Sequence, residues 1–175
     1  LAPRFMSEWI ECARDAAAAA RDYGDAVRSR VHERVAQGGS VDAGLVTREQ
    51  HAVHGFAWIA ATNAALEATA DWAARTKAAG NFGRLEELTL RIGFGEYCAQ
   101  LVSAVPMSAG EFVRPHALGT AREAAVLADD PAVARFLAEG NTPETRNELA
   151  ALLCDGARPD DGLGHETLDL VTAQF

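Results

Sequence analysis

The amino-acid sequence predicts an all-α protein, a helical bundle built on a long antiparallel helical hairpin with shorter helices toward the C-terminus. Apolar residues recur at helical spacing over Thr47–Ala79 and again over Phe82–Val105. Only a short break at Gly80-Asn81 separates the two runs, and so short a connection returns the second helix antiparallel to the first. A composition of 49% hydrophobic and 23% charged residues fits a globular chain.

The first predicted helix covers about Arg4–Gln37. One face of it is apolar, and its members are Met6, Trp9, Ala13, Ala16, Ala20, Tyr23, Val27, Val31 and Val35. Gly24 lies inside the run, where glycine costs roughly 1 kcal/mol relative to alanine, so a bend or break is expected there. Gly38-Gly39-Ser40 is expected to end the helix.

The second predicted helix begins at Thr47, because Thr47 and Gln50 match the capping-box pattern, and it runs to about Ala79. It has two apolar stripes. The first contains Trp58, Ala61, Ala65, Ala68 and Trp72; the second contains Phe56, Ile59, Asn63, Leu66, Ala70 and Ala73. Two adjacent apolar stripes predict contacts over a wide arc, so we expect this helix at the centre of the bundle.

The third predicted helix, about Phe82–Val105, also has two stripes. They consist of Leu85, Leu88, Ile92, Ala99 and Val102, and of Leu90, Phe94, Tyr97, Leu101 and Val105. Gly93 and Gly95 interrupt the helix interior at roughly 1 kcal/mol each. Close packing against the tryptophans of the second helix, or a kink, is favoured over a contact with a ligand.

Shorter elements follow a loop at Pro106–Pro115, in which Met107, Phe112 and Val113 are apolar enough to dock on the bundle. Three short helices are predicted at Leu118–Ala128, Pro131–Glu139 and Pro143–Cys154. Asp130 and Thr142 each precede a proline and are expected to be N-caps. Gly140 and Gly156 are candidate C-caps.

At 175 residues the chain fits one domain, which we place at residues 1–156. Residues 157–175 are predicted to be an exposed linker followed by the beginning of a further helix. In that run Leu168, Val171 and Phe175 keep helical spacing, and no C-cap follows them. We therefore expect the chain to be a fragment of a longer polypeptide.

The net charge of −9 argues against binding to nucleic acid or to an anionic membrane surface, because both need a basic face. No apolar run approaches the roughly 20 residues of a membrane span, and no secretory signal is recognisable. Cys12, Cys98 and Cys154 form an odd set without a CxxC pair, and each lies in an apolar context. Buried, reduced thiols are expected, as in a cytoplasmic protein.

Few residues suggest chemistry. His51 and His54 lie three apart on a helix and can share a metal ion, but the carboxylate pattern of a di-iron bundle is absent. Carboxylates occur at Glu67, Asp71, Glu86, Glu87 and Glu96. Ion pairs on solvated surfaces with Arg75, Lys77, Arg84 and Arg91 are favoured for them over acid–base chemistry. Glu96, between Gly95 and Tyr97, is the exception that most needs inspection.

No nucleotide-binding loop, GxSxG, HExxH or Cys–His signature is present. The residues alone therefore nominate no catalytic, cofactor-binding or metal-binding position.

The central stretch nevertheless resembles a known family. The segments HGFAW, IGFGEY and PMSAGEFVRP, within about His51–Gly119, resemble the N-terminal extension of methylsuccinyl-CoA dehydrogenases. These are flavin-dependent members of the acyl-CoA dehydrogenase family in the ethylmalonyl-CoA pathway. The ending LGHETLDLVTAQF is similar to the start of the first helix of the dehydrogenase core.

The resemblance implies a parent enzyme that removes hydrogen across the α,β bond of a short branched acyl-CoA, with FAD as hydride acceptor and a glutamate as base. It places the FAD pocket and that glutamate in the core, so no site residue is carried onto this chain. The implied role of these residues is structural or assembly-related. The implied partners are the dehydrogenase core of the same chain and further copies in a homo-oligomer.

Two alternatives stay open. One is a stand-alone helical module that binds a protein partner through Phe94, Tyr97 and Leu101. The other is a small helical enzyme or metal protein that uses His51, His54 and Glu96.

Overall fold

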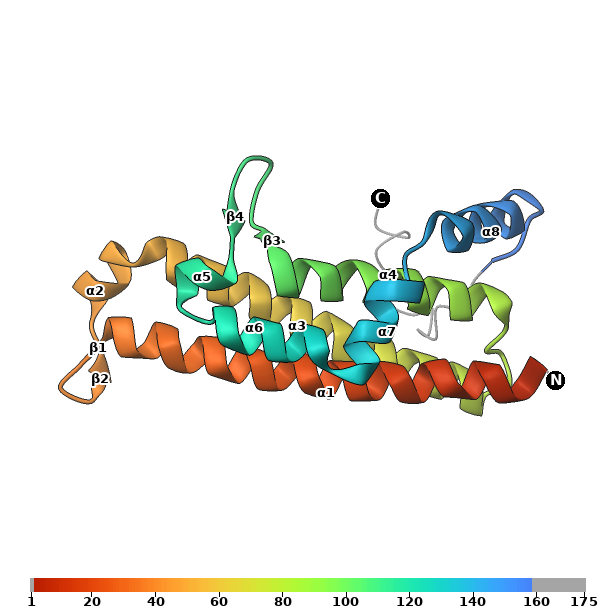
Figure 1. Ribbon diagram of the computed structural model, residues 1–175, viewed down its shortest axis with the longest axis horizontal. Coiled ribbons are helices and arrows are strands. Elements are labelled where there is room, and N and C mark those ends of the chain that lie inside the picture. Colours follow the sequence, from red (N-terminus) through yellow and green to blue (C-terminus); the bar gives the residue numbers. More distant parts are fainter. Residues whose placement is uncertain (1, 159–175) are drawn as a thin grey trace, which may run out of the picture.

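The computed structural model describes residues 2–158 and shows an all-α protein. Three long helices form its body: α1 (Ala2–Val35), α3 (Gln50–Ala78) and α4 (Arg84–Ser103). In Figure 1, α1 runs along the lower edge over the full length of the bundle, with α3 and α4 above it. The most extensive helix–helix contact is between α1 and α3. The pair formed by α1 and α3 is therefore the largest seam of the bundle.

Helix α1 follows the periodic pattern closely. The predicted face is buried from Trp9 to Val35, and Ala13, Ala16, Ala20 and Val27 are fully enclosed. Helix α1 continues through Gly24 without the break that the sequence allows there. Gly24 allows α3 to lie close to α1, because a Cβ at this position would collide with Nδ2 of Asn63. That amide donates a hydrogen bond to the Ala20 carbonyl at 2.8 Å, which ties α3 to α1.

After α1 the chain turns through a two-stranded ladder. Strand β1 (Ala36–Gln37) pairs antiparallel with β2 (Ser40–Val41), and Gly38 and Gly39 between them have positive φ angles. These left-handed conformations favour glycine and explain why Gly38-Gly39 ends the helical run.

The predicted start of the second helix at Thr47 is wrong. Asp42 caps a short helix α2 (Ala43–Arg48) by accepting a hydrogen bond from the Leu45 N–H at 2.8 Å. The Thr47 hydroxyl donates to the Ala43 carbonyl inside α2, so it is not an N-cap. Helix α3 begins at Gln50, directly after Glu49. The capping-box pattern at Thr47 is present in the sequence, but the N-cap is Asp42, five residues earlier.

Only one of the two stripes on α3 is core. The stripe with Ile59, Asn63, Leu66, Ala70 and Ala73 is buried, and Phe56 is half-buried. Most of the tryptophan stripe is left uncovered by residues 2–158: Trp58 is 42% exposed, and Ala61, Ala65 and Ala68 are exposed. Trp72, at its end, is half-buried and packs against the core. The expected wide arc of contact is therefore found on one side of α3 only.

Helix α4 packs between α3 and the shorter helices. Leu88, Leu90, Phe94 and Leu101 are fully enclosed, whereas Tyr97 is 40% exposed. Gly95 lies at a close contact between helices, as expected, but the contact is not with a tryptophan. A Cβ at Gly95 would lie 2.7 Å from the backbone nitrogen of Asn141, and none of its nearest neighbours is a tryptophan. Around Gly93 the space is open, since no heavy atom lies within 4 Å of a Cβ placed there.

The loop after α4 is a small hairpin of β3 (Val105–Pro106) and β4 (Phe112–Val113). It projects from the upper side of the bundle in Figure 1. Met107 and Val113 are buried as expected, with Val113 packed against Gly55 of α3, while Phe112 is 41% exposed.

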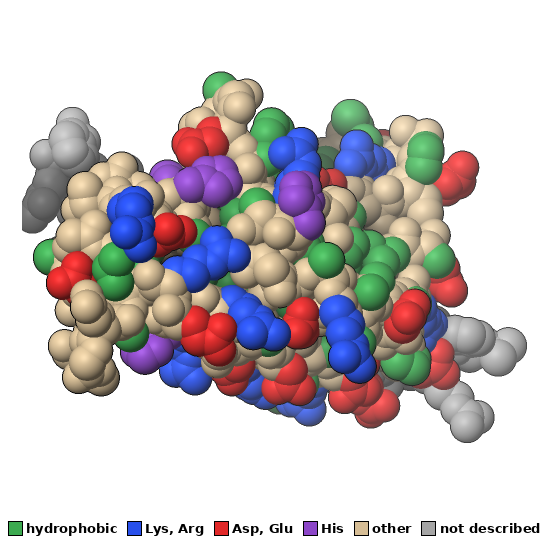
Figure 2. Space-filling view, turned by 60° about the vertical axis from the view of Figure 1, so that its left-hand side comes forward, with side chains coloured by type: hydrophobic (Ala, Val, Ile, Leu, Met, Phe, Trp, Pro, Cys, Tyr) green, Lys and Arg blue, Asp and Glu red, His purple; other side chains and the backbone are tan. Residues whose placement is uncertain are grey.

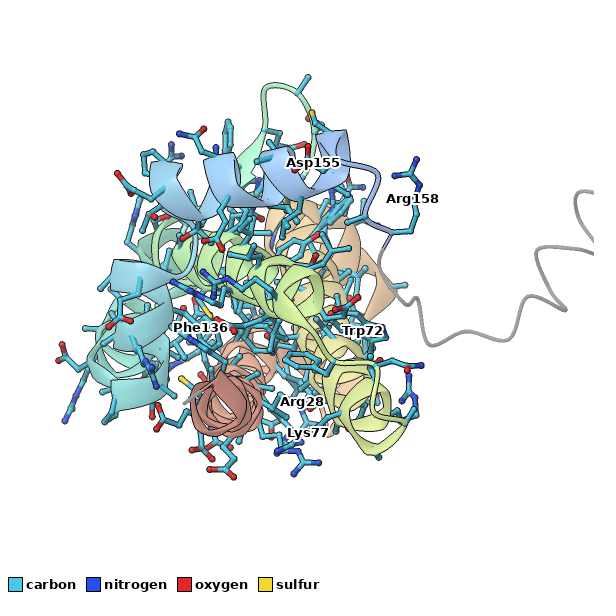
Figure 3. All side chains as sticks on the ribbon, turned by 90° about the vertical axis from the view of Figure 1, so that its right-hand side faces the viewer. Arg28, Trp72, Lys77, Phe136, Asp155 and Arg158 are labelled. Atoms are coloured by element: carbon cyan, nitrogen blue, oxygen red, sulfur yellow. The ribbon has the colours of Figure 1, made fainter. Side chains whose placement is uncertain are left out.

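Four shorter helices complete the described chain: α5 (Pro115–Leu118), α6 (Ala121–Asp129), α7 (Pro131–Glu139) and α8 (Pro143–Cys154). Asp130 and Thr142 cap α7 and α8 as the sequence predicts. Figure 3, seen along the bundle, shows α6 and α7 on one side, α3 on the other and α8 across the top of α4. Phe136 of α7 points inward and stacks on Phe94 at a centroid distance of 4.8 Å.

The assignment of residues 157–175 to a linker and a further helix stays a prediction. Residues 159–175, with Leu168, Val171 and Phe175, lie outside the described part of the chain.

The two glycines of α4 give a matched pair of substitutions. We expect Gly93→Ala to raise the free energy of unfolding by about 0.5–1 kcal/mol, because alanine favours a helix interior and meets open space. Gly95→Ala should lower it by about 1–3 kcal/mol, because the added Cβ overlaps the backbone of Asn141. Urea denaturation followed by circular dichroism measures both. The same sign for both variants would contradict this packing.

Candidate functional site

The two histidines of α3 have separate partners. His51 Nδ1 lies 3.2 Å from Oε1 of Glu111, on the β3–β4 loop. His54 Nε2 accepts a hydrogen bond from Nε1 of Trp58 at 2.9 Å. Across residues 2–158, no cluster of three His, Cys, Asp or Glu side chains is arranged to hold a metal ion. The histidines therefore fix the loop and a tryptophan ring.

Glu86 and Glu87 were expected on a solvated surface, and that expectation is wrong. Both residues are buried, at 5% and 4% exposure. Glu86 accepts a hydrogen bond from the Gly83 N–H at 2.8 Å, at the N-terminus of α4, where the helix dipole favours negative charge. Glu87 accepts from two arginines, Arg84 at 2.6 Å and Arg91 at 3.4 Å. The helical spacing of Glu87 with Arg84 and Arg91 was expected, but the burial of Glu86 and Glu87 was not.

Arg84 links this buried carboxylate to α8. Its guanidinium donates two hydrogen bonds of 2.6 Å to Glu148, a geometry that suits the planar fork of arginine. These hydrogen bonds hold the pKa of the Glu148 carboxyl below its usual value. Glu87 and Glu148 therefore share Arg84, and the cluster fastens α8 to α4.

Arg91 continues the cluster into the core. Its Nη2 donates to the Glu139 carbonyl at 2.8 Å, at the end of α7. Its guanidinium lies 4.5 Å from the centre of the Trp9 ring, and that of Arg135 lies 4.1 Å from the same ring. Trp9 in turn contacts Phe136 at 5.1 Å. Sequence analysis missed this arrangement because its members come from three helices far apart in the chain.

Glu96 lies at a different place from the histidines. Its carboxylate accepts hydrogen bonds from Gln100 at 3.0 Å and from Asn141 at 2.8 Å, and Arg146 of α8 lies 3.8 Å away. Its side chain is 48% exposed, so these are ordinary surface interactions at the contact between α4 and α8. The structure does not bring Glu96 together with His51 and His54, which have their own partners.

The three cysteines differ from the expectation in one respect. All are free thiols, and Cys12 and Cys98 are buried, but Cys154 at the end of α8 is exposed. Burial raises the pKa of the Cys12 thiol to about 11 and that of Cys98 to about 12. The two buried thiols behave as small apolar groups that fill the core.

Two of the surface hollows are poorly suited to FAD. A groove of about 350 Å³ between α1 and α6 is lined by Asp22, Glu123 and Asp130 against one cation, Arg122. Its carboxylates would repel a diphosphate group. Another of about 490 Å³ between α4 and α8 has an apolar wall with Leu149 and Leu153, and its Arg146 already contacts Glu96.

The surface as a whole carries interspersed charges. Acidic and basic side chains alternate along the lower edge of the face drawn in Figure 2. Several form ion pairs, among them Arg21 with Glu67 at 2.9 Å. None of the helices within residues 2–158 has the length and hydropathy of a membrane span.

Comparison with known proteins identifies a relative. No protein-family model matches the chain. It is 33% identical, over 97% of its length, to the (2S)-methylsuccinyl-CoA dehydrogenase of Cereibacter sphaeroides. This match confirms the resemblance that the motifs indicate. The aligned region amounts to 31% of that enzyme, so the chain spans less than a third of the length of its relative.

The carboxylates held by Arg84 provide a test of the cluster. Glu87→Gln should lower the free energy of unfolding by about 2 kcal/mol, because it removes a buried negative charge and leaves Arg84 and Arg91 without their shared partner. Glu148→Gln should change it by less than about 1 kcal/mol, because that carboxylate is 46% exposed. Urea denaturation at neutral pH measures both. Equal losses would contradict the different burial of the two carboxylates.

Thiol labelling tests the cysteine assignments. With a thiol-specific disulfide reagent at pH 8, we expect one fast reaction, at Cys154. The other two thiols should react only after unfolding, because burial blocks them and their raised pKa values keep them protonated. Cys154→Ser should abolish the fast phase. A fast reaction that survives this substitution would show that Cys12 or Cys98 is accessible.

Proposed function

We propose that this chain is a non-catalytic helical domain of a larger FAD-dependent acyl-CoA dehydrogenase. The observation that carries the proposal is the extent of the match: 97% of this chain aligns with a methylsuccinyl-CoA dehydrogenase, but 31% of that enzyme is covered. A chain that matches so small a share of an enzyme is well explained as one of its domains. We assign it to the N-terminal extension, as the motifs suggest.

The proposed parent reaction is α,β-dehydrogenation of a short branched acyl-CoA such as methylsuccinyl-CoA. In that reaction a glutamate base takes the α-proton, and FAD takes the β-hydride. We place both groups in the part of the parent enzyme that these 175 residues do not include. The acidic lining of the groove between α1 and α6 supports this placement.

The role we propose for these residues is to support the assembly of the parent enzyme. The contact between α1 and α3 and the ion pairs of Arg84 hold the described helices around one apolar core. A domain built in this way can pack on a neighbouring domain without taking part in the chemistry.

Expression of the complete reading frame tests the proposal. We expect the purified protein to carry bound flavin, and we expect methylsuccinyl-CoA to bleach the visible flavin absorbance as the flavin is reduced. A matched sample of residues 1–158 should contain no flavin. A full-length product without flavin, or a flavin-binding fragment of residues 1–158, would contradict the proposal that the flavin site lies in the rest of the parent enzyme.

A further inference from the structure

The outward side of α3 is unlike the outward side of the other long helix. In α1, every exposed side chain from Glu8 to Glu33 is charged, serine or histidine. In α3, the exposed positions between Gly55 and Leu66 are all alanine except for Trp58, and no charged residue occurs in that stretch. The solvent-facing side of a surface helix normally carries polar residues, as α1 does. This side of α3 therefore has the composition of a buried face.

Two exposed aromatic side chains lie on α3 and on its neighbour α4. Trp58 is 42% exposed, although its Nε1 is held by His54 at 2.9 Å and its ring is thereby oriented. Tyr97 of α4 is 40% exposed. Ala65 and Tyr97 lie the same number of residues from the connection between α3 and α4, so antiparallel packing places them at one level. We call Trp58, Ala61, Ala65, Ala68 and Tyr97 the open face.

An oriented tryptophan and an exposed tyrosine beside an uncharged helix side are typical of a protein interface. Alanine in the middle of such a surface allows a partner helix to approach closely. In Figure 3, α3 lies on the opposite side of the bundle from α6 and α7, so these two helices do not cover its outward side.

We propose that the open face is the surface on which the rest of the parent polypeptide packs, by means of an apolar helix side. This inference rests on the proposed function. The matched relative is more than three times as long as the aligned region, so a polypeptide of ample size is available to cover the face. A covalently linked partner has a high effective concentration, which favours it over a second copy of this chain.

Thiol accessibility in the full-length parent protein tests whether the face is covered. Cys154→Ser removes the exposed native thiol, and Ala65→Cys or Ala125→Cys then adds one new thiol. Ala125 is the matched control, because it is an exposed alanine on α6. Peptide mapping should show the Ala65→Cys thiol labelled at least about tenfold more slowly than the Ala125→Cys thiol, since labelling must await opening of the interface. Equal rates would overturn the proposal.

Cross-linking identifies what covers the face. A benzophenone amino acid replaces Trp58 in the full-length protein, and the cross-linked peptides are sequenced. Cross-links to peptides beyond residue 175 support the proposal. Cross-links confined to residues 1–158 of a second copy, or no cross-link at all, overturn it. Either contradicting outcome can occur in a preparation that binds flavin and is reduced by methylsuccinyl-CoA. In that case the proposed packing on the open face is wrong, and the proposed function stands.

Discussion

The close approach of α1 and α3 is the constraint on which the rest of the fold depends. Alanines and Gly24 on α1 leave room for Asn63 of α3 to reach the Ala20 carbonyl across the seam. A larger side chain at Gly24 would collide with that amide, so the seam requires small residues on α1 and a specific polar partner on α3. Once these two helices are held together, α4 and the short helices have a fixed surface to cover.

A second close contact positions the C-terminal part. Gly95 of α4 and Gly140 at the end of α7 touch backbone to backbone, and a Cβ at Gly140 would lie 2.7 Å from the Arg91 carbonyl. The arginines then connect the same region: Arg91 binds Glu87 and the end of α7, and Arg84 binds Glu148 of α8. Glycine contacts set the distance between these helices, and the ion pairs set their register. Together these contacts fix α7 and α8 on α4.

In the structure, an apolar side of a helix is not always a buried side. Both stripes of α3 are apolar, and from the sequence both read as core. The protein covers one of them with α1 and α4. Within residues 2–158, Trp58 and the alanines of the other stripe stay exposed, whereas Trp72 is half-buried. Apolar side chains are costly to leave in water, so the difference between pattern and burial is what distinguishes this side of α3 from the outward side of α1.

The sequence by itself determined what depends on near neighbours in the chain. Helical periodicity predicted the long helices, and Asp130 and Thr142 were recognised as caps because each bonds to an amide within three residues. Only the tertiary structure decided which stripe of α3 is covered, that Glu87 is buried and that Cys154 is exposed. Periodicity defines the faces of a helix, but burial is conferred by elements distant in sequence, such as α8, whose Glu148 meets Arg84. Those long-range contacts are absent from any local pattern.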